Sequence, residues 1–274
     1  MIPIIGGTLD HDGESLYWEL AGEEGLPVLA LCHGAGGNHG SWFQQVPHFA
    51  DRYRVLTWDH RGFGMSTDRA ERSGPEVAVG DLAALLDHIG AAEAHLVGQS
   101  MGGWTVLGFT LRWPERARSL VLADSLGGCP VPGWLERTAA RLGDDGVVLG
   151  RHVAVGPHLR ETDPTKVYLY QQLSGMGRSF GAFIPKSVAR GLSDTVHDPA
   201  DLAEVSCPVL CIVGADDAIF TPDWTRQAAA LLPTATVEVI EQAGHSPYFE
   251  QPDAWNRVLD GFLAGIAATA GGRT

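Results

Sequence analysis

Short apolar runs alternate with amphipathic segments along most of the chain, and this pattern predicts an α/β protein. The apolar runs are continuous, which is typical of strands buried on both faces of a mostly parallel, doubly wound sheet. We expect strands at 27–32, 54–58, 94–98, 119–123, 208–214 and 236–240, after a hairpin within 8–21. We expect helices at 41–50, 104–113, 221–232 and 252–267.

One more helix is expected between the strands at 54–58 and 94–98. Ser73 and Glu76 have the spacing of a capping box, with a proline in the first turn. The leucines that follow repeat with the helical period of about 3.6 residues. Gly90 is a suitable residue just beyond the end of this helix.

The alternation stops between about residues 126 and 200, where glycine, proline and scattered aromatic residues replace the apolar strands. We therefore expect a core formed by residues 1–125 and 201–274, with residues 126–200 inserted as a helical cap. The cap should lie over the carboxyl edge of the sheet, where open α/β sheets bind ligands. Helical pieces are expected within it near 133–142, 164–174 and 185–193.

A serine lies where one expected strand gives way to a helix, in the sequence Gly98-Gln99-Ser100-Met101-Gly102. A sharp strand-to-helix turn would lift the Ser100 hydroxyl above the sheet edge and direct the Met101 N–H into the same space. Small residues are needed on both sides because side chains there would collide. A glycine-serine loop without chemistry is the alternative, but the strand–turn–helix setting favours a nucleophile.

A serine hydroxyl needs a base, and the base needs a group that orients it. His245 follows the last expected strand in a glycine-flanked loop, and imidazole is suited to proton transfer near neutral pH. Three acids follow strands and could orient it, namely Asp124, Asp216 and Asp217. From the residues alone these three remain open.

These motifs together resemble the α/β-hydrolase fold over essentially the whole chain. The residues that carry the resemblance are His33-Gly34, Asp59-x-Arg61-Gly62-x-Gly64-x-Ser66, Gly98-Gln99-Ser100-Met101-Gly102-Gly103, Gly214-x-x-Asp217 and Gly244-His245. The resemblance implies that Asp217, three residues after its glycine, is the acid. It also implies that the Ala35 N–H joins that of Met101 in an oxyanion hole, and that the Asp59–Arg61 loop is structural.

The resemblance implies a serine hydrolase that forms an acyl-enzyme through Ser100, His245 and Asp217 and requires no cofactor. A serine at the elbow disfavours the relatives that use an aspartate nucleophile, such as dehalogenases and epoxide hydrolases. The loop from His33 to Asn38 resembles those of esterases and lactonases, and the aromatic residues of the cap suggest an apolar substrate pocket. We therefore expect cleavage of a carboxylic ester or lactone of a small, largely apolar substrate.

Two other functions stay open. Hydrolases of carbon–carbon bonds in ring-fission products share much of this pattern, and their anionic substrates need a fixed positive charge. Arg190, near the end of the cap, is the cation that would favour that chemistry. A non-catalytic protein that binds a small ligand on the same fold is the third possibility.

Other enzyme classes fit poorly. The glycines at 34–37 would begin a dinucleotide-binding fingerprint, but its third glycine would fall at His39. No metal-binding sequence motif appears, so we expect no metal.

Charge and cysteine content restrict the partners and the compartment. The formal net charge of −14 over 274 residues argues against binding to nucleic acid or to an anionic membrane. The four cysteines have no zinc-site spacing, and we expect free thiols in a reducing compartment. No secretory signal or membrane-spanning run appears. We therefore expect a cytoplasmic protein whose partner is a small-molecule substrate.

Overall fold

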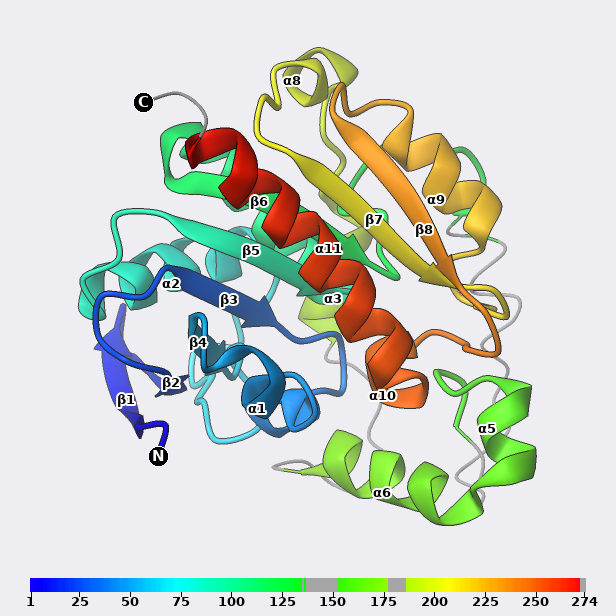
Figure 1. Cartoon of the computed structure of the whole chain (residues 1–274), viewed down its shortest axis with the longest axis horizontal. Coiled ribbons are helices and arrows are strands. Elements are labelled where there is room, and N and C mark those ends of the chain that lie inside the picture. The colour runs from blue at the N-terminus through cyan, green and yellow to red at the C-terminus, as the bar shows by residue number, and fades with distance from the viewer. Residues whose placement is uncertain (135, 137–151, 177–185, 272–274) are drawn as a thin grey trace.

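A mixed sheet of eight strands forms the centre of the computed structural model, which describes residues 1–134, 136, 152–176 and 186–271 (Figure 1). Its order is β1-β2-β4-β3-β5-β6-β7-β8. The pairs β1·β2 and β2·β4 are antiparallel, and all the others are parallel, which confirms the expected mostly parallel sheet. The strands are β1 (Ile4–His11), β2 (Glu14–Ala21), β3 (Val28–Cys32), β4 (Arg54–Trp58), β5 (Ala94–Gln99), β6 (Ala117–Ala123), β7 (Val209–Gly214) and β8 (Ala235–Ile240).

Helices cover both faces of this sheet. In Figure 1, α1 and α11 lie on the face toward the viewer, and α2 and α3 lie behind it. The helices of the core are η1 (His39–Trp42), α1 (Val46–Phe49), α2 (Pro75–His88), α3 (Met101–Arg112), η2 (Pro114–Arg116), α9 (Pro222–Ala229), α10 (Pro247–Glu250) and α11 (Pro252–Gly271). The inserted segment and its exit carry α5 (Pro157–Thr162), α6 (Pro164–Gly175), α7 (Lys186–Asp194) and α8 (Pro199–Ala203).

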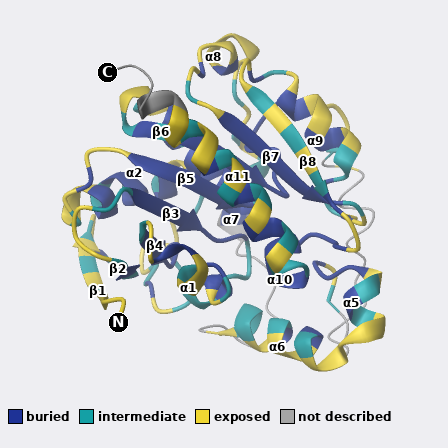
Figure 2. Cartoon of the chain, viewed as in Figure 1, coloured by how far each residue is buried: buried dark blue, intermediate teal, exposed yellow. Residues whose placement is uncertain are grey.

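The pleat of the strands divides the core into two layers. Successive side chains of a strand point to opposite faces, so Ala30 and Cys32 of β3 pack with α2 and α3. Leu29 and Leu31 of the same strand pack on the other face, with Trp42 and α11. The central strands are buried on both faces (Figure 2), which explains their continuous apolar sequences. Full burial of one such leucine stabilises the fold by about 1.5–3 kcal/mol.

Two local expectations are wrong. The capping box at Ser73 does not form, because α2 begins one residue later with Gly74 as its N-cap. Ser73 is buried outside the helix, and its N–H donates to Asp68 Oδ2 over 3.1 Å. The helix expected at 41–50 is two short pieces, η1 and α1. Pro47 in the first turn of α1 has no N–H for a helical bond to an earlier carbonyl, so a continuous helix is not favoured.

The insertion is helical where it is described. The pieces expected near 164–174 and 185–193 are confirmed by α6 and α7. The short helix α5 was not expected, and the piece near 133–142 falls largely outside the described residues. In Figure 1, α5 and α6 lie beside the carboxyl ends of β7 and β8, below α10.

The Asp59 and Arg61 side chains of the loop after β4 form hydrogen bonds inside the core. Arg61 is buried and makes a two-point contact with Asp81, with Nε and Nη2 donating over 2.8 and 2.6 Å. Asp59 is also buried, and it accepts bonds from the N–H groups of His39 and Met65. All four cysteines are free thiols. No helix in the described part of the chain is long and apolar enough to cross a bilayer.

Candidate active site

Five strands of the sheet end at the same edge, and each is followed by a loop that carries a residue singled out from the sequence. These strands, β3, β5, β6, β7 and β8, are adjacent and parallel. In strand order the residues are Ala35, Ser100, Asp124, Asp217 and His245. The parallel topology therefore brings together residues that are up to 210 positions apart in the sequence.

Ser100 occupies a strained backbone conformation between β5 and α3, with φ 50° and ψ −116°. A non-glycine residue in such a conformation costs about 1–3 kcal/mol, so its surroundings must enforce it. The Ser100 N–H donates to Ala123 O over 2.9 Å. A side chain at Gly98 would collide with the Gly102 backbone, and one at Gly102 with the backbone of Cys32. The strand–turn–helix elbow expected from the sequence is present.

The expected oxyanion donors adjoin this elbow. Residues 34–37 form a tight turn in which the Gly37 N–H donates to Gly34 O over 2.9 Å, with Gly36 at φ 84°. Gly34 is pressed so closely against the Gln99 and Ser100 side chains that a Cβ would overlap them. Ala35 packs against the apolar cluster that contains Met101. The Met101 N–H opens α3 and has no partner within the helix.

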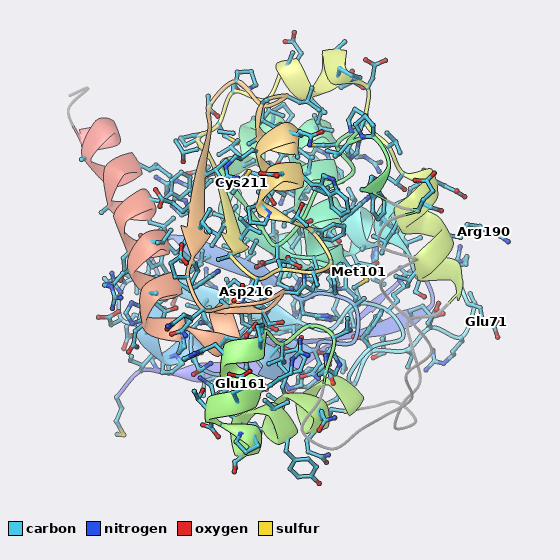
Figure 3. All side chains as sticks on the ribbon, turned by 90° about the vertical axis from the view of Figure 1, so that its right-hand side faces the viewer. Glu71, Met101, Glu161, Arg190, Cys211 and Asp216 are labelled. Carbon is cyan, nitrogen blue, oxygen red and sulfur yellow. The ribbon has the colours of Figure 1, made fainter. Side chains whose placement is uncertain are left out.

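The structure joins Asp217 to His245. His245 Nδ1 lies 2.9 Å from Asp217 Oδ2, and both side chains are buried. The other oxygen, Asp217 Oδ1, accepts bonds from the N–H groups of Ile219 and Phe220 over 2.7 and 3.0 Å. A carboxylate held in this way orients the imidazole and leaves Nε2 free to accept a proton. Asp216 is exposed on the same turn (Figure 3).

The loops of Ser100 and His245 are linked through Gln99. The buried Gln99 side chain donates through Nε2 to His245 O over 2.9 Å. No hydrogen bond joins the Ser100 hydroxyl to the His245 ring, although both residues are among those described. Bonds of this kind are often long in the absence of substrate and tighten in the Michaelis complex.

Asp124 lies beside Asp217 as a buried acid. Its Oδ1 accepts the Gly214 N–H over 2.9 Å, and its buried Oδ2 finds no donor among the described residues. Burial first, and the charge of Asp217 next, raise the pKa of Asp124 well above its ordinary value. A protonated Asp124 can donate to Asp217, which accounts for the oxygen that lacks a donor.

The ligand atoms of Asp124, Asp217 and His245 all lie within 4.8 Å of one another, a spacing that a metal ion also requires. In this structure Asp217 and His245 are hydrogen-bonded to each other, with Oδ2 and Nδ1 2.9 Å apart.

Glu250, which the sequence analysis missed, fastens the histidine loop. The buried carboxylate accepts bonds from the N–H groups of Gly244 and Ser246, over 2.9 and 3.3 Å, and of Gly156 over 2.7 Å. Burial raises its pKa to about 7, against the lowering effect of these three bonds. Five residues beyond His245, it looks like an ordinary surface glutamate of a short helix, so no pattern distinguished it.

His152 was also missed, because it lies in the insertion without any periodic signal. The Ala154 N–H donates to its Nδ1 over 3.1 Å, and its ring stands edge-on to Tyr170 at 4.8 Å. Burial lowers its pKa to about 4, and the nearby charge of His245 acts in the same direction. His152 is therefore a neutral imidazole near the base.

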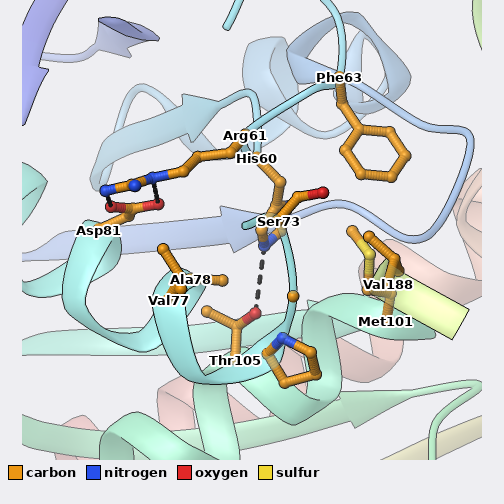
Figure 4. Close-up of a pocket in the computed structure, with 12 residues that line it drawn as sticks. His60, Arg61, Phe63, Ser73, Val77, Ala78, Asp81, Met101, Thr105 and Val188 are labelled. Carbon is orange, nitrogen blue, oxygen red and sulfur yellow. Dashed lines mark hydrogen bonds and ion pairs between the residues drawn. The ribbon is translucent and has the colours of Figure 1, made fainter. Parts of the chain in front are cut away.

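Two hollows near the site are poor candidates for substrate binding. One beside Met101, bounded by Phe63 and Val188, has a volume of about 10 Å³ (Figure 4), which suits a single water molecule. The other is an open groove of about 1150 Å³ between α2, α3 and α7. Arg190 lines that groove and points outward in Figure 3. Neither Ser100 nor His245 is among the described residues that line it.

The sequence and the fold both match known proteins. A family model described as the alpha/beta hydrolase fold matches residues 27–252. A 3-oxoadipate enol-lactonase of Acinetobacter baylyi is 27% identical, over 93% of this chain and 96% of that protein.

Two solved structures resemble the whole chain. An esterase from Thermogutta terrifontis is 27% identical with a TM-score of 0.78, covering 96% of this chain and 99% of its own. The 2-hydroxy-6-oxo-6-phenylhexa-2,4-dienoate hydrolase of Rhodococcus sp. strain RHA1 is 25% identical with a TM-score of 0.76. That match covers 96% of this chain and all of the other.

The raised pKa of Glu250 predicts a pH-dependent stability that Glu250→Gln should remove. Between the ordinary value of 4.5 and the folded value of about 7, the folded protein binds more protons at this site than the unfolded chain. The free energy of unfolding should therefore fall as pH rises through this window, by up to about 3 kcal/mol from this group. Urea unfolding of both proteins from pH 4.5 to 7.5 measures the difference.

The exposed Glu161 provides the matched control. Glu161→Gln should keep the pH dependence of the wild type. Parallel wild-type and Glu250→Gln curves across the window would contradict the raised pKa.

Proposed function

Because this chain belongs to the α/β hydrolase fold family, we propose that it is a serine hydrolase that cleaves a carboxylic ester or lactone of a small, largely apolar substrate. Ser100 is the nucleophile, His245 the base and Asp217 the group that orients the base. The hydrogen bond between Asp217 and His245, beside a serine held at φ 50°, is the observation that carries the proposal.

The mechanism follows from these positions. His245 Nε2 takes the hydroxyl proton as Ser100 Oγ bonds to the substrate carbonyl carbon, whose oxygen becomes an oxyanion. The N–H groups of Ala35 and Met101 stabilise that oxyanion by about 3–4 kcal/mol each. The imidazolium then protonates the leaving alcohol as the ester bond breaks. Water, deprotonated by His245, attacks the acyl-enzyme and releases the acid and Ser100.

Charge supports an ester or lactone over a ring-fission product. A dienoate carries a carboxylate, and its site should supply a fixed cation. Of the cap arginines that are described, Arg160 donates to Val155 O and Arg190 faces the outer groove. Ala35 packs against an apolar cluster of Phe63, Met101 and Val188. The esterase and the enol-lactonase among the relatives agree with this choice.

A non-catalytic binding protein is the alternative, and it explains fewer features of the site. Such a protein would gain nothing from a strained serine beside a buried acid–histidine pair, whereas a nucleophile requires both.

A fluorophosphonate should label the protein once, at Ser100, and abolish ester hydrolysis, because only an activated serine attacks phosphorus rapidly. Intact mass and peptide mapping measure the labelling. Ser100→Ala should lose both labelling and activity, and the matched control Ser193→Ala should keep both. Labelling of Ser100→Ala, or hydrolysis by it at the wild-type rate, would refute the nucleophile.

Substitution by asparagine should distinguish the three acids by its effect on kcat. Asp217→Asn should lower kcat by a factor on the order of 10⁴, because the amide stabilises the wrong imidazole tautomer. Asp124→Asn should cost less than about tenfold, since an amide reproduces the hydrogen bonds of a protonated acid. The exposed Asp216→Asn should have no effect on kcat. A severe loss in either of the latter two, with a mild one in Asp217→Asn, would show that another acid orients His245.

The class of bond can be decided by comparing kcat/KM for a neutral ester or lactone with that for an anionic ring-fission dienoate. We expect the neutral substrates to be preferred by more than about tenfold, because the two described cap arginines are bonded to Val155 O or line the outer groove. Arg190→Ala should leave this preference unchanged. If the dienoate is preferred and Arg190→Ala removes the preference, the enzyme is a carbon–carbon bond hydrolase.

A further inference from the structure

Asn38 connects the oxyanion loop to the cap. Its side chain is fully buried, and its Nδ2 donates to Leu173 O, near the end of α6, over 2.6 Å. Its Oδ1 accepts the Gly40 N–H over 2.9 Å and so caps η1. Because both ends of the amide are bonded, the position of α6 and the end of the oxyanion loop are fixed relative to each other.

Tyr170 connects the same helix to the histidine loop. Its hydroxyl lies 2.8 Å from Ser246 Oγ, and Ser246 directly follows His245. Burial raises the pKa of Tyr170 to about 12, so the phenol keeps its proton at neutral pH. Its ring stands edge-on to Phe249 at 5.0 Å, which fixes the direction of the hydroxyl.

The Tyr170 and Leu173 side chains share one face of α6, because they are three positions apart and pack on the same core layer. The bond to Asn38 comes from the backbone carbonyl of Leu173, near the end of the same helix. Val167, one further turn back, is fully buried in the core layer that contains Trp42 and Phe249. Apolar contacts therefore seat α6 against the core, and the two polar contacts set where each loop lies. In Figure 1, α6 passes below α1 and α10.

Buried side chains on the core side of α6 adjoin the same two segments. Tyr248 of α10 packs on Trp42 of η1, with ring centroids 4.7 Å apart. Ser41 Oγ accepts the Asn38 N–H over 3.1 Å. The sheet itself provides no such connection, since three strands stand between β3 and β8. Gln99 bonds to the histidine loop, and its side chain packs against Gly34 at the start of the oxyanion loop, away from Asn38 at its end.

We infer that α6 acts as a bracket, bonded to Asn38 at one end and to Ser246 through Tyr170 at the other. It holds the oxyanion loop at a set distance from the histidine loop, with Asn38 and Tyr170 as positioning residues. The inference rests on the function proposed above. Neither side chain needs to touch the substrate. They act through Ala35, three residues before Asn38, and through His245. A displacement of about 1 Å in such a group can lower a rate about 100-fold.

Tyr170→Phe tests one end of the bracket with the least disturbance, because it removes only the hydroxyl. We expect kcat to fall about 10- to 100-fold and KM to change less than about threefold. Tyr168→Phe, on the exposed side of the same helix, is the matched control and should match the wild type. Asn38→Ser tests the other end. Serine can still cap η1, but it has no amide N–H for Leu173 O, and the same pattern of loss is expected.

A boronic acid inhibitor separates positioning from a general structural effect, because it forms a tetrahedral adduct with the serine. Its affinity should fall in both variants in parallel with kcat/KM, while that of the product carboxylate is unchanged. The double variant should lose less than the product of the two single losses, because releasing either end of a bracket already frees the two loops.

Three results would overturn the inference, provided that the wild type is labelled at Ser100 and hydrolyses esters. The first is a Tyr170→Phe variant with the kcat of the wild type, and the second is a loss of kcat in Tyr168→Phe as large as that in Tyr170→Phe. The third is a double variant whose loss of kcat equals the product of the two single losses. If Tyr170→Phe does not fold, Ser246→Ala removes the same hydrogen bond from the other side and carries the same expectation. A wild type that is neither labelled nor active refutes the proposed function instead.

Discussion

Close backbone packing around the Ser100 elbow is the constraint on which the rest of the site depends. Gly98 lies against the backbone of Gly102, which in turn lies against Cys32 at the end of β3. Side chains at either glycine would force β3, β5 and α3 apart. This packing holds the serine at φ 50° and sets the oxyanion loop directly beside it. The strain of one residue is thus balanced by contacts that also assemble the neighbouring loop.

The three buried acids of the site differ in their hydrogen-bond partners. Asp217 accepts bonds from two N–H groups through Oδ1, and its Oδ2 lies 2.9 Å from His245 Nδ1. Asp124 has one N–H donor and Glu250 has three, yet burial raises the pKa of both. Of the three acids, only Asp217 is hydrogen-bonded to the His245 ring among the described residues, which is the position that the proposed mechanism requires.

Much of the architecture could be predicted from the sequence because it depends on local patterns. The continuous apolar runs identified the central strands, and Gly98 and Gly102 identified the elbow. Where a local signal competed with packing, the prediction was wrong, as at Ser73, whose N–H is bonded to Asp68. The choice of Asp217 over Asp216 needed the family resemblance, because burial distinguishes them and adjacent residues give no sign of it.

The contacts that support the site could not be predicted, because they join segments far apart in the sequence. Glu250 bonds to Gly156, 94 residues away, and Asn38 bonds to Leu173, 135 residues away. Each is an ordinary polar residue in its own segment, and only the tertiary fold gives it a role. Residues 156, 170 and 173 therefore contact the loops after β3 and β8 through backbone and hydroxyl groups that carry no sequence motif.

A crystal structure of the protein after reaction with a phosphonate tests this account most directly. The account predicts a bond from Ser100 Oγ to phosphorus and a phosphoryl oxygen about 2.7–3.1 Å from both the Ala35 and Met101 nitrogens. It also predicts that the His245–Asp217 hydrogen bond is kept. An adduct on another residue, or a phosphoryl oxygen directed away from those two N–H groups, would contradict it.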